Sequence, residues 1–168
     1  MESVRCFNFE SKNELHQFII KHKDFLKSLV DIKESSGISA SPFKPNDFYE
    51  YFMKNAKGKN RVYLFYEGKE PIGLIYGYKA PFEKNEFTLS FFAVKKEYQG
   101  KGIGRRFLRK VYDKLSLKEL GFTTFGMVAE KGTRIINQKI ASGRKYKLES
   151  KGIRDKVIVR PKLRHIIK

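Results

Sequence analysis

The stretch that decides the fold is EYQGKGIGRR, residues 97–106, because the residue pattern changes abruptly across it. Before it, residues 87–94 are rich in Phe, Leu and Val, which is typical of a strand. After it, apolar residues recur every four positions from Ile103 to Leu115, which predicts an amphipathic helix that continues to about Lys118. The stretch therefore predicts a strand, a glycine-rich turn and a helix, in that order.

A glycine-rich turn in this setting is suited to bind an anion. Successive backbone N–H groups point outward at the start of a helix, where the helix dipole is also positive. Glycine allows a phosphate to approach the backbone closely and permits positive φ. Three basic residues, Lys101, Arg105 and Arg106, add positive charge to the same turn. We therefore expect a phosphate-bearing ligand, with a glycine turn that binds nothing as the alternative.

Two common phosphate motifs do not fit the turn. A Walker A loop requires Ser or Thr directly after its lysine, whereas Gly102 follows Lys101. A dinucleotide fingerprint that begins at Gly100 requires its third glycine where this chain has Arg105. Nucleoside triphosphates and nicotinamide dinucleotides are therefore not the ligands that this turn predicts.

The segment Val94 to Leu108 resembles the acetyl-CoA-binding motif of the GNAT superfamily of N-acetyltransferases. In that motif a strand that ends in Val is followed by Gln or Arg, two residues, Gly, one residue, and Gly or Ala. Here Gln99, Gly102 and Gly104 occupy those three positions. The resemblance implies a GNAT-type fold and an acetyl-CoA-dependent N-acetyltransferase.

The remaining pattern predicts an α/β domain with a mixed sheet, in the order β-α-α-β-β-β-α-β-α-β-β, which matches that family from Val4 to Val159. A capping box at Ser11 and Glu14 begins a single helix that ends near Ser35. The other expected elements are strands over residues 4–9, 61–67, 72–79, 123–129, 144–149 and 153–159, and helices over residues 46–53 and 133–141. We expect one domain over residues 1–160 and a basic tail over residues 161–168.

The resemblance also implies which residues bind acetyl-CoA. The strands over 87–94 and 123–129 would splay apart, and pantetheine would lie between them against the backbone of Phe92, Ala93 and Val94. A backbone N–H near Ala93 or Val94 would polarise the thioester carbonyl, as an oxyanion hole does. The pyrophosphate would sit on the backbone N–H groups of the turn, namely Gln99, Gly100, Lys101, Gly102, Ile103, Gly104 and Arg105.

Direct attack by an amine requires a base for its proton and benefits from an acid for the thiolate. The family often has a carboxylate on the strand before the turn, but the inward positions here are Thr88 and Ser90. We therefore expect Ser90 to hold a water that takes the proton, or Glu86 to take it from the rim of the site. Alternatively, Ser90 only bonds within the strand and Glu86 is merely solvated.

The family's usual acid is a Tyr seven residues after an Asn on the helix that follows the next strand. Counting back from Gly143, this chain has Gly132 at the Asn position and Lys139 at the Tyr position. Tyr146 is the nearest tyrosine, but in this register it lies on the following strand. The thiolate would then be protonated by water, or the register of the helix would differ by several residues.

Charge gives the main indication of a partner. The net charge is +18, and residues 131–168 alone carry thirteen Lys or Arg against two acids. Such a surface attracts polyanions and repels polycations, although a general lysine bias would give the same composition. We therefore expect an acceptor amine carried on or near nucleic acid: an aminoacyl-tRNA, a modified base or a nucleic-acid-associated protein. The alternative is a catalytically degenerate module of the same fold that binds nucleic acid or a protein partner.

Other classes of protein do not fit the composition. Cys6 is the only cysteine, and the three histidines form no metal-binding pattern, so we expect neither an internal disulfide nor a metal. No apolar run approaches the roughly 20 residues that a membrane span needs, and the first residues do not resemble a signal peptide. These features predict a cytoplasmic protein, monomeric or homodimeric, that does not bind membranes.

Overall fold

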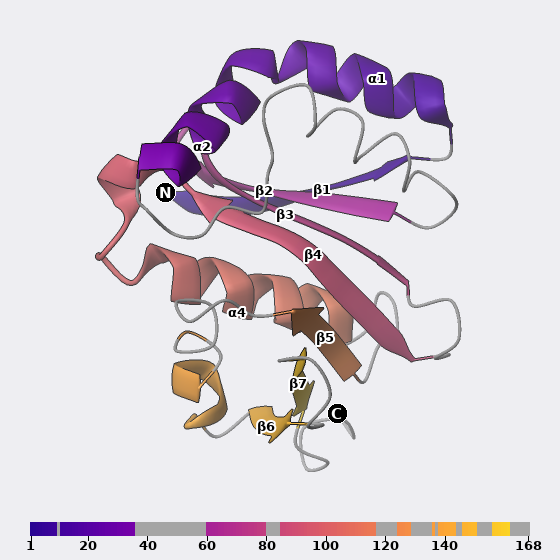
Figure 1. Ribbon diagram of the computed structural model, residues 1–168, viewed down its shortest axis with the longest axis vertical. Coiled ribbons are helices and arrows are strands. Elements are labelled where there is room, and N and C mark those ends of the chain that lie inside the picture. The colour runs from indigo at the N-terminus through magenta and orange to yellow at the C-terminus, as the bar shows by residue number, and fades with distance from the viewer. Residues whose placement is uncertain are drawn as a thin grey trace.

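The computed structural model describes residues 1–9, 11–35, 60–79, 85–116, 124–128, 136, 138–143, 146–150 and 156–161. These residues form a twisted sheet with helices on both of its faces (Figure 1). The helices α1 (Lys12–Lys21) and α2 (Lys23–Ser35) lie on one face, and α4 (Ile103–Ser116) lies on the other (Figure 1).

The sheet contains seven strands in the order β1-β2-β3-β4-β5-β7-β6. The strands are β1 (Glu2–Phe9), β2 (Asn60–Glu67), β3 (Glu70–Lys79), β4 (Glu86–Val94), β5 (Thr124–Val128), β6 (Tyr146–Ser150) and β7 (Lys156–Pro161). Only β4 and β5 are parallel neighbours, and every other pair is antiparallel. The predicted mixed sheet is therefore confirmed, and its parallel pair includes β4, the strand that precedes the glycine turn.

The helices are α1 (Lys12–Lys21), α2 (Lys23–Ser35), the 3-10 helix η1 (Lys96–Tyr98) and α4 (Ile103–Ser116). Residues 136 and 138–141 are also helical, within the helix predicted for 133–141. The predicted cap at the start of α1 is present, because the Ser11 side chain accepts a hydrogen bond from the Glu14 N–H at 3.2 Å. The helix expected over residues 46–53 lies outside the described residues.

The single helix predicted from Ser11 to Ser35 is wrong, because the chain breaks at His22. There the backbone leaves helical geometry, with φ −109° and ψ 17°. A straight helix over this stretch would be about 36 Å long, against about 27 Å for the neighbouring eight-residue strand β1. The break changes the direction of the chain, so that both helices keep apolar residues on the sheet.

Two apolar clusters fill the spaces between the three layers. One lies between the sheet and α1 and α2, and it includes Leu15, Phe18, Phe25, Leu26, Leu29, Leu64, Leu74 and Phe91. The other lies between the sheet and α4, and it includes Tyr63, Phe65, Phe87, Leu89, Phe107, Leu108, Val111 and Tyr112. On β2 the alternation is complete, because Leu64 faces the first cluster while Tyr63 and Phe65 face the second.

Candidate active site

The strand β4 has two neighbours, but it keeps only one of them along its whole length. It pairs with β3 as far as Val94, which lies opposite Gly73. Its pairing with β5 stops at Leu89, opposite Met127. Among the residues that the structure describes, no strand therefore pairs with residues 92–94 on the β5 side. This end of the pairing is where the family resemblance places a splay between the two strands.

An irregularity in β4 lies where the splay begins. Leu89 lies opposite Gly77 and Phe91 lies opposite Tyr76, so Ser90 is an extra residue in β4. The bulge also reverses the alternation of side chains. Leu89 belongs to the cluster under α4, whereas Phe91 belongs to the cluster under α1 and α2. The sequence placed Ser90 near the site, but gave no sign of the bulge.

Two hydrogen bonds from Gln99 hold the connection between β4 and α4 in place. The Gln99 backbone N–H donates to the Lys96 carbonyl at 3.0 Å, and the Gln99 side-chain amide donates to the Val94 carbonyl at 2.8 Å. Gly100 and Gly102 then adopt positive φ, +75° and +72°, which residues with a side chain rarely adopt. The turn expected from the glycine pattern is therefore present, and two of its glycines are required by backbone conformation.

The first turn of α4 offers backbone donors. The first bond of helical spacing runs from the Arg106 N–H to the Gly102 carbonyl, at 3.1 Å. The N–H groups of residues 103–105 precede that bond, so they have no partner within the helix. They are the kind of donors that bind a phosphate. The Gln99 N–H, which we had counted among them, is instead engaged with Lys96, so the set of amides is shorter at its start.

Gly104 is required for a different reason from Gly102. Its φ is not positive, but a Cβ atom built on it would lie 3.2 Å from the Phe92 ring and 3.4 Å from Ile136. That spacing is tighter than most real contacts of a Cβ atom. The absence of a side chain therefore lets the end of β4 pack against the first turn of α4.

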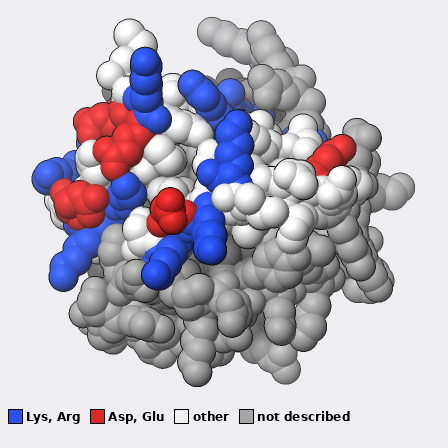
Figure 2. All heavy atoms as spheres, turned by 90° about the horizontal axis from the view of Figure 1, so that it is seen from above, with Lys and Arg blue, Asp and Glu red and all other residues white. Residues whose placement is uncertain are grey.

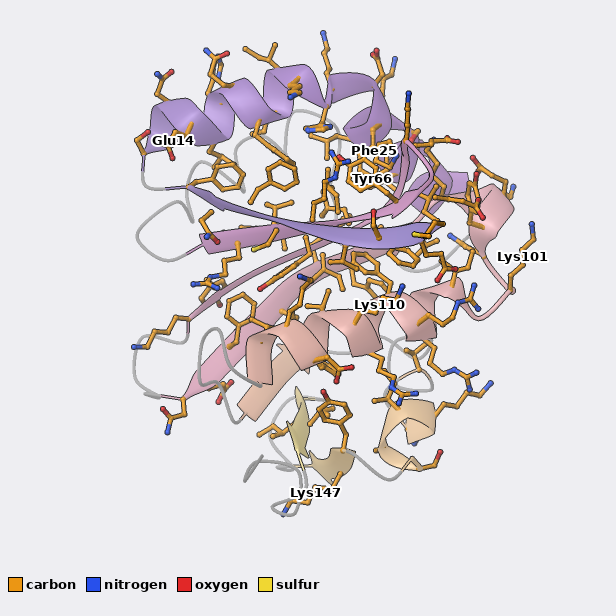
Figure 3. All side chains as sticks on the ribbon, turned by 180° about the vertical axis from the view of Figure 1, so that it is seen from behind. Glu14, Phe25, Tyr66, Lys101, Lys110 and Lys147 are labelled. Atoms are coloured by element: carbon orange, nitrogen blue, oxygen red, sulfur yellow. The ribbon has the colours of Figure 1, made fainter. Side chains whose placement is uncertain are left out.

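The basic residues of the turn have different surroundings. Lys101 and Arg105 are exposed, and Figure 3 shows Lys101 projecting outward from the turn. Arg106 is instead bound to Glu2, with 2.8 Å between the Arg106 Nη2 and the Glu2 Oε1. These hydrogen bonds lower the pKa of Glu2 and raise that of Arg106. Arg106, which we had counted as charge available to the ligand, is therefore already paired.

A second ion pair fastens η1 to the hairpin between β2 and β3. Lys95 lies against Glu70, and the Tyr98 hydroxyl donates to the same carboxylate at 3.4 Å. The hydrogen bond from Lys95 lowers the pKa of Glu70, while burial raises the pKa of Tyr98. The segment before the glycine turn is thus attached to the sheet.

Two of the predicted catalytic side chains, Glu86 and Tyr146, are buried. Glu86 is only 5% exposed, so it is neither at the rim nor solvated. Tyr146 is 1% exposed, and its hydroxyl donates to Asp113 on α4. Its strand β6 lies at the far edge of the sheet, with β7 and β5 between it and β4. The structure therefore does not bring Tyr146 to the open edge of β4, and we withdraw it as the acid.

The residues at the family's usual Asn and Tyr positions give no alternative acid. Lys139 is exposed in the helical segment that ends before Gly143, and Gly132 lies outside the described residues. Sequence reasoning missed Glu2, which is 104 positions from Arg106. It also missed the bond from the Gln99 side chain to Val94, since Gln99 is a motif position whose role we had assigned to the ligand.

Within the described ranges, no helix is long and apolar enough to cross a membrane. In the same part of the chain, no group of three or more His, Cys, Asp or Glu residues is arranged to hold a metal ion.

The fold and the site together define an acyltransferase class, and comparisons with known proteins agree. Residues 26–133 match the acetyltransferase (GNAT) family. The chain therefore belongs to the GNAT family, and its class is that of an acetyl-CoA-dependent N-acetyltransferase. No curated protein matches the sequence.

Solved structures with the same fold have low sequence identity to the chain. An acetyltransferase from Thermus thermophilus aligns with a TM-score of 0.65 at 17% identity, over 95% of this chain and 97% of that one. The ribosomal-protein-S18-alanine N-acetyltransferase of Escherichia coli gives 0.59 at 13% identity, over 100% and 96%. The PaiA N-acetyltransferase of Thermoplasma acidophilum, solved in complex with coenzyme A, gives 0.52 at 14% identity, over 95% and 99%. At these identities the likeness shows the fold alone.

Proposed function

We propose that the chain binds acetyl-CoA across the open edge of β4 and the glycine turn, and transfers the acetyl group to a primary amine. The observation that carries this proposal is that two sets of backbone groups able to bind a ligand follow one another in the chain, at the end of β4 and at the start of α4. Residues 92–94 have an edge without a strand partner in the described part of the chain, and α4 begins nine residues after Val94 with amides that have no partner within the helix. Pantetheine, which carries two amide groups, suits the first set, and a diphosphate suits the second.

The reaction needs little chemistry from side chains. The amine nitrogen forms a bond to the carbonyl carbon of the thioester, and the bond from that carbon to sulfur breaks. A backbone N–H near Ala93 or Val94 stabilises the oxyanion that forms between these events. The departing thiolate takes its proton from water, since Tyr146 is engaged with Asp113 on α4.

Two groups could receive the proton of the attacking amine, a water at Ser90 or the carboxylate of Glu86. The positions of these residues along β4 favour the water at Ser90. Ser90 lies at the bulge, where the splay begins. Glu86 lies four residues earlier, about 13 Å along the strand, so a proton would reach it only through several waters. We therefore assign the proton to a water held at Ser90, with Glu86 as the alternative acceptor.

The acceptor amine is proposed to be carried on or near nucleic acid. The net charge of +18 disfavours polycations such as spermine. Exposed cations surround the proposed diphosphate position, namely Lys101, Arg105 and Arg109. On the face that carries α1 and α2, by contrast, Lys and Arg alternate with carboxylates (Figure 2). Exposed positive charge is therefore present in the turn and in the helix that follows it.

Calorimetry with acetyl-CoA tests the donor, and release of the free CoA thiol tests the acceptor. We expect binding below about 1 mM, and faster thiol release with aminoacyl-tRNA than with deacylated tRNA, spermine or a short peptide with a free N-terminus. Absence of binding at that concentration would refute the donor assignment. Turnover that is fastest with spermine would refute the nucleic-acid acceptor while leaving the donor assignment intact.

One observation favours the second candidate, a binding module without turnover. The exposed Lys139 holds the position at which the family usually has its acid, and Tyr146 is buried elsewhere. Gel shifts with tRNA and duplex DNA over a range of salt concentrations distinguish the two candidates. A steep salt dependence with no acetyl transfer to any acceptor would favour the module. Weak binding together with turnover would exclude it.

A further inference from the structure

The Arg106 guanidinium connects two parts of the chain that are far apart in sequence, the start of β1 and the glycine turn. Its Nε and Nη2 donate to the carboxylate of Glu2 at 3.2 and 2.8 Å, and its Nη1 donates to the Lys101 carbonyl at 3.1 Å. Lys110 adds a second contact, with 3.6 Å between its Nζ and the Glu2 Oε2. Figure 3 shows Lys110 reaching from α4 toward the sheet. The first residue of β1 is therefore tied through Arg106 to the middle of the glycine turn.

This tie controls the direction of one backbone amide. A trans peptide unit is planar, and its C=O and N–H groups point in opposite directions. The carbonyl of Lys101 and the N–H of Gly102 belong to the same peptide unit. Because Arg106 holds that carbonyl toward itself and Glu2, the N–H of Gly102 must point away from them. Because residue 102 is a glycine, which adopts φ of either sign, this unit could otherwise rotate between two turn types.

We propose that Glu2 is a positioning residue for acetyl-CoA binding, which acts by holding Arg106 on the Lys101 carbonyl so that the Gly102 N–H faces the diphosphate. The proposal rests on the function proposed above. In this proposal Arg106 binds the Lys101 carbonyl of the turn and does not bind the phosphate. Its position after Arg105, in a basic pair next to the proposed diphosphate, would by itself suggest a phosphate contact. Glu2 keeps it there, because two of the three guanidinium nitrogens bind the carboxylate.

A purely electrostatic role of Glu2 predicts the opposite change in acetyl-CoA affinity. Measuring whether affinity rises or falls when Glu2 is removed therefore distinguishes the two roles. If Glu2 acted only through its charge, removing it would raise the positive potential at the turn and strengthen binding of acetyl-CoA. If Glu2 positions Arg106, removing it frees the Lys101 peptide and weakens binding. We expect Glu2→Ala to weaken acetyl-CoA binding about 3- to 10-fold, the effect of losing one well-placed hydrogen bond.

A charge exchange separates the ion pair from the hydrogen bond to the turn. The double variant Glu2→Arg with Arg106→Glu restores opposite charges, but the side chain at position 106 then has no N–H to donate to the Lys101 carbonyl. We expect it to recover most of the Tm that each single variant loses, without recovering the affinity for acetyl-CoA. Recovery of both would overturn the proposal, because the ion pair alone would then be sufficient. Lys27→Ala, which removes an exposed cation of α2 on the opposite face of the sheet from α4, is the control and should retain wild-type affinity.

A measurement without ligand keeps the test independent of the proposed function. Hydrogen exchange of the amides in residues 99–105 should be faster in Glu2→Ala than in the wild type, with little change in α1. In one outcome, the wild type binds no acetyl-CoA while the amides of residues 99–105 exchange faster in Glu2→Ala. That outcome would refute the proposed function and support the role of Glu2 in holding the turn. If the wild type bound acetyl-CoA and neither exchange nor affinity changed in Glu2→Ala, the positioning role would be refuted and the proposed function retained.

Discussion

The Gln99 side-chain amide donates to the Val94 carbonyl at 2.8 Å, which fastens the beginning of the glycine turn to the last residue of β4. This bond sets the distance between the open strand edge and the amides of α4, the two places where one ligand is proposed to bind. We therefore expect Gln99→Ala to weaken acetyl-CoA binding about tenfold at most, the equivalent of one hydrogen bond. Calorimetry measures this, with the exposed Gln138→Ala as the control. Unchanged affinity in Gln99→Ala would mean that the turn keeps its place without the bond.

A methyl group at Gly104 should be harmful because of Phe92. The added Cβ would lie 3.2 Å from that ring, so the ring must shift by a few tenths of an ångström in a packed site. We expect Gly104→Ala to lower the free energy of unfolding by about 1–3 kcal/mol and to weaken acetyl-CoA binding. In Phe92→Leu the smaller side chain should accommodate the methyl group, so the double variant should be more stable than the sum of the single effects predicts. Urea unfolding of all four proteins measures the coupling, and simple additivity would contradict the packing role.

Tyr146 should contribute to stability and not to chemistry. Its hydroxyl donates to Asp113, and its ring lies 5.7 Å from the ring of Tyr112, between centroids. Tyr146→Phe keeps the ring contact and removes the hydroxyl. We expect the free energy of unfolding to fall by about 0.5–1.5 kcal/mol and kcat to stay unchanged. A large fall in kcat with intact stability would restore Tyr146 as the general acid.

The break between α1 and α2 should be sensitive to acid. His22 packs on Phe18, with 4.5 Å between ring centroids, and burial lowers its pKa from the ordinary value of 6.5. The folded state therefore binds the proton less readily than the unfolded state. The contribution of His22 to stability is complete above about pH 6.5 and is lost as the pH falls from there through the folded pKa.

Thermal unfolding at about pH 7.5 and about pH 5.5, on either side of the ordinary pKa of histidine, measures this effect. Other groups also titrate in this range, so the wild type is compared with His22→Asn, which cannot be protonated. We expect the wild type to lose more Tm than the variant between the two pH values. Equal losses in the two proteins would show that His22 is as easily protonated in the fold as outside it.

The parts of the structure that the sequence predicted are those with a local pattern. The strand, turn and helix around residues 97–106 follow from strand composition, glycine and fourfold spacing, all within a short stretch of chain. The cap of Ser11 on Glu14 is equally local, and it is present. The family's motif further identified the turn, since the positions of Gln99, Gly102 and Gly104 carry the resemblance.

The parts that the sequence did not predict depend on contacts between distant segments. Glu2 reaches Arg106 across 104 positions, and no pattern in either segment indicates it. Tyr146 looked like a candidate acid because of its type, whereas its burial depends on where β6 pairs in the sheet. The break at His22 depends on the size of the sheet that the two helices cover, which no residue near His22 encodes.

The bulge at Ser90 leads to a last prediction, about the proton of the attacking amine. Ser90 is the extra residue at the point where β4 leaves β5, whereas Glu86 is buried where the two strands are still paired, opposite Thr124. We therefore expect Ser90→Ala to lower kcat about tenfold or more while leaving the KM for acetyl-CoA nearly unchanged. Glu86→Gln should keep most of kcat, although it changes a buried group and its stability must be checked by thermal unfolding. The pH profile of kcat decides between the two routes. If Glu86→Gln removed the acidic limb of that profile while Ser90→Ala left kcat intact, the buried carboxylate would be the base and the shorter route would be wrong.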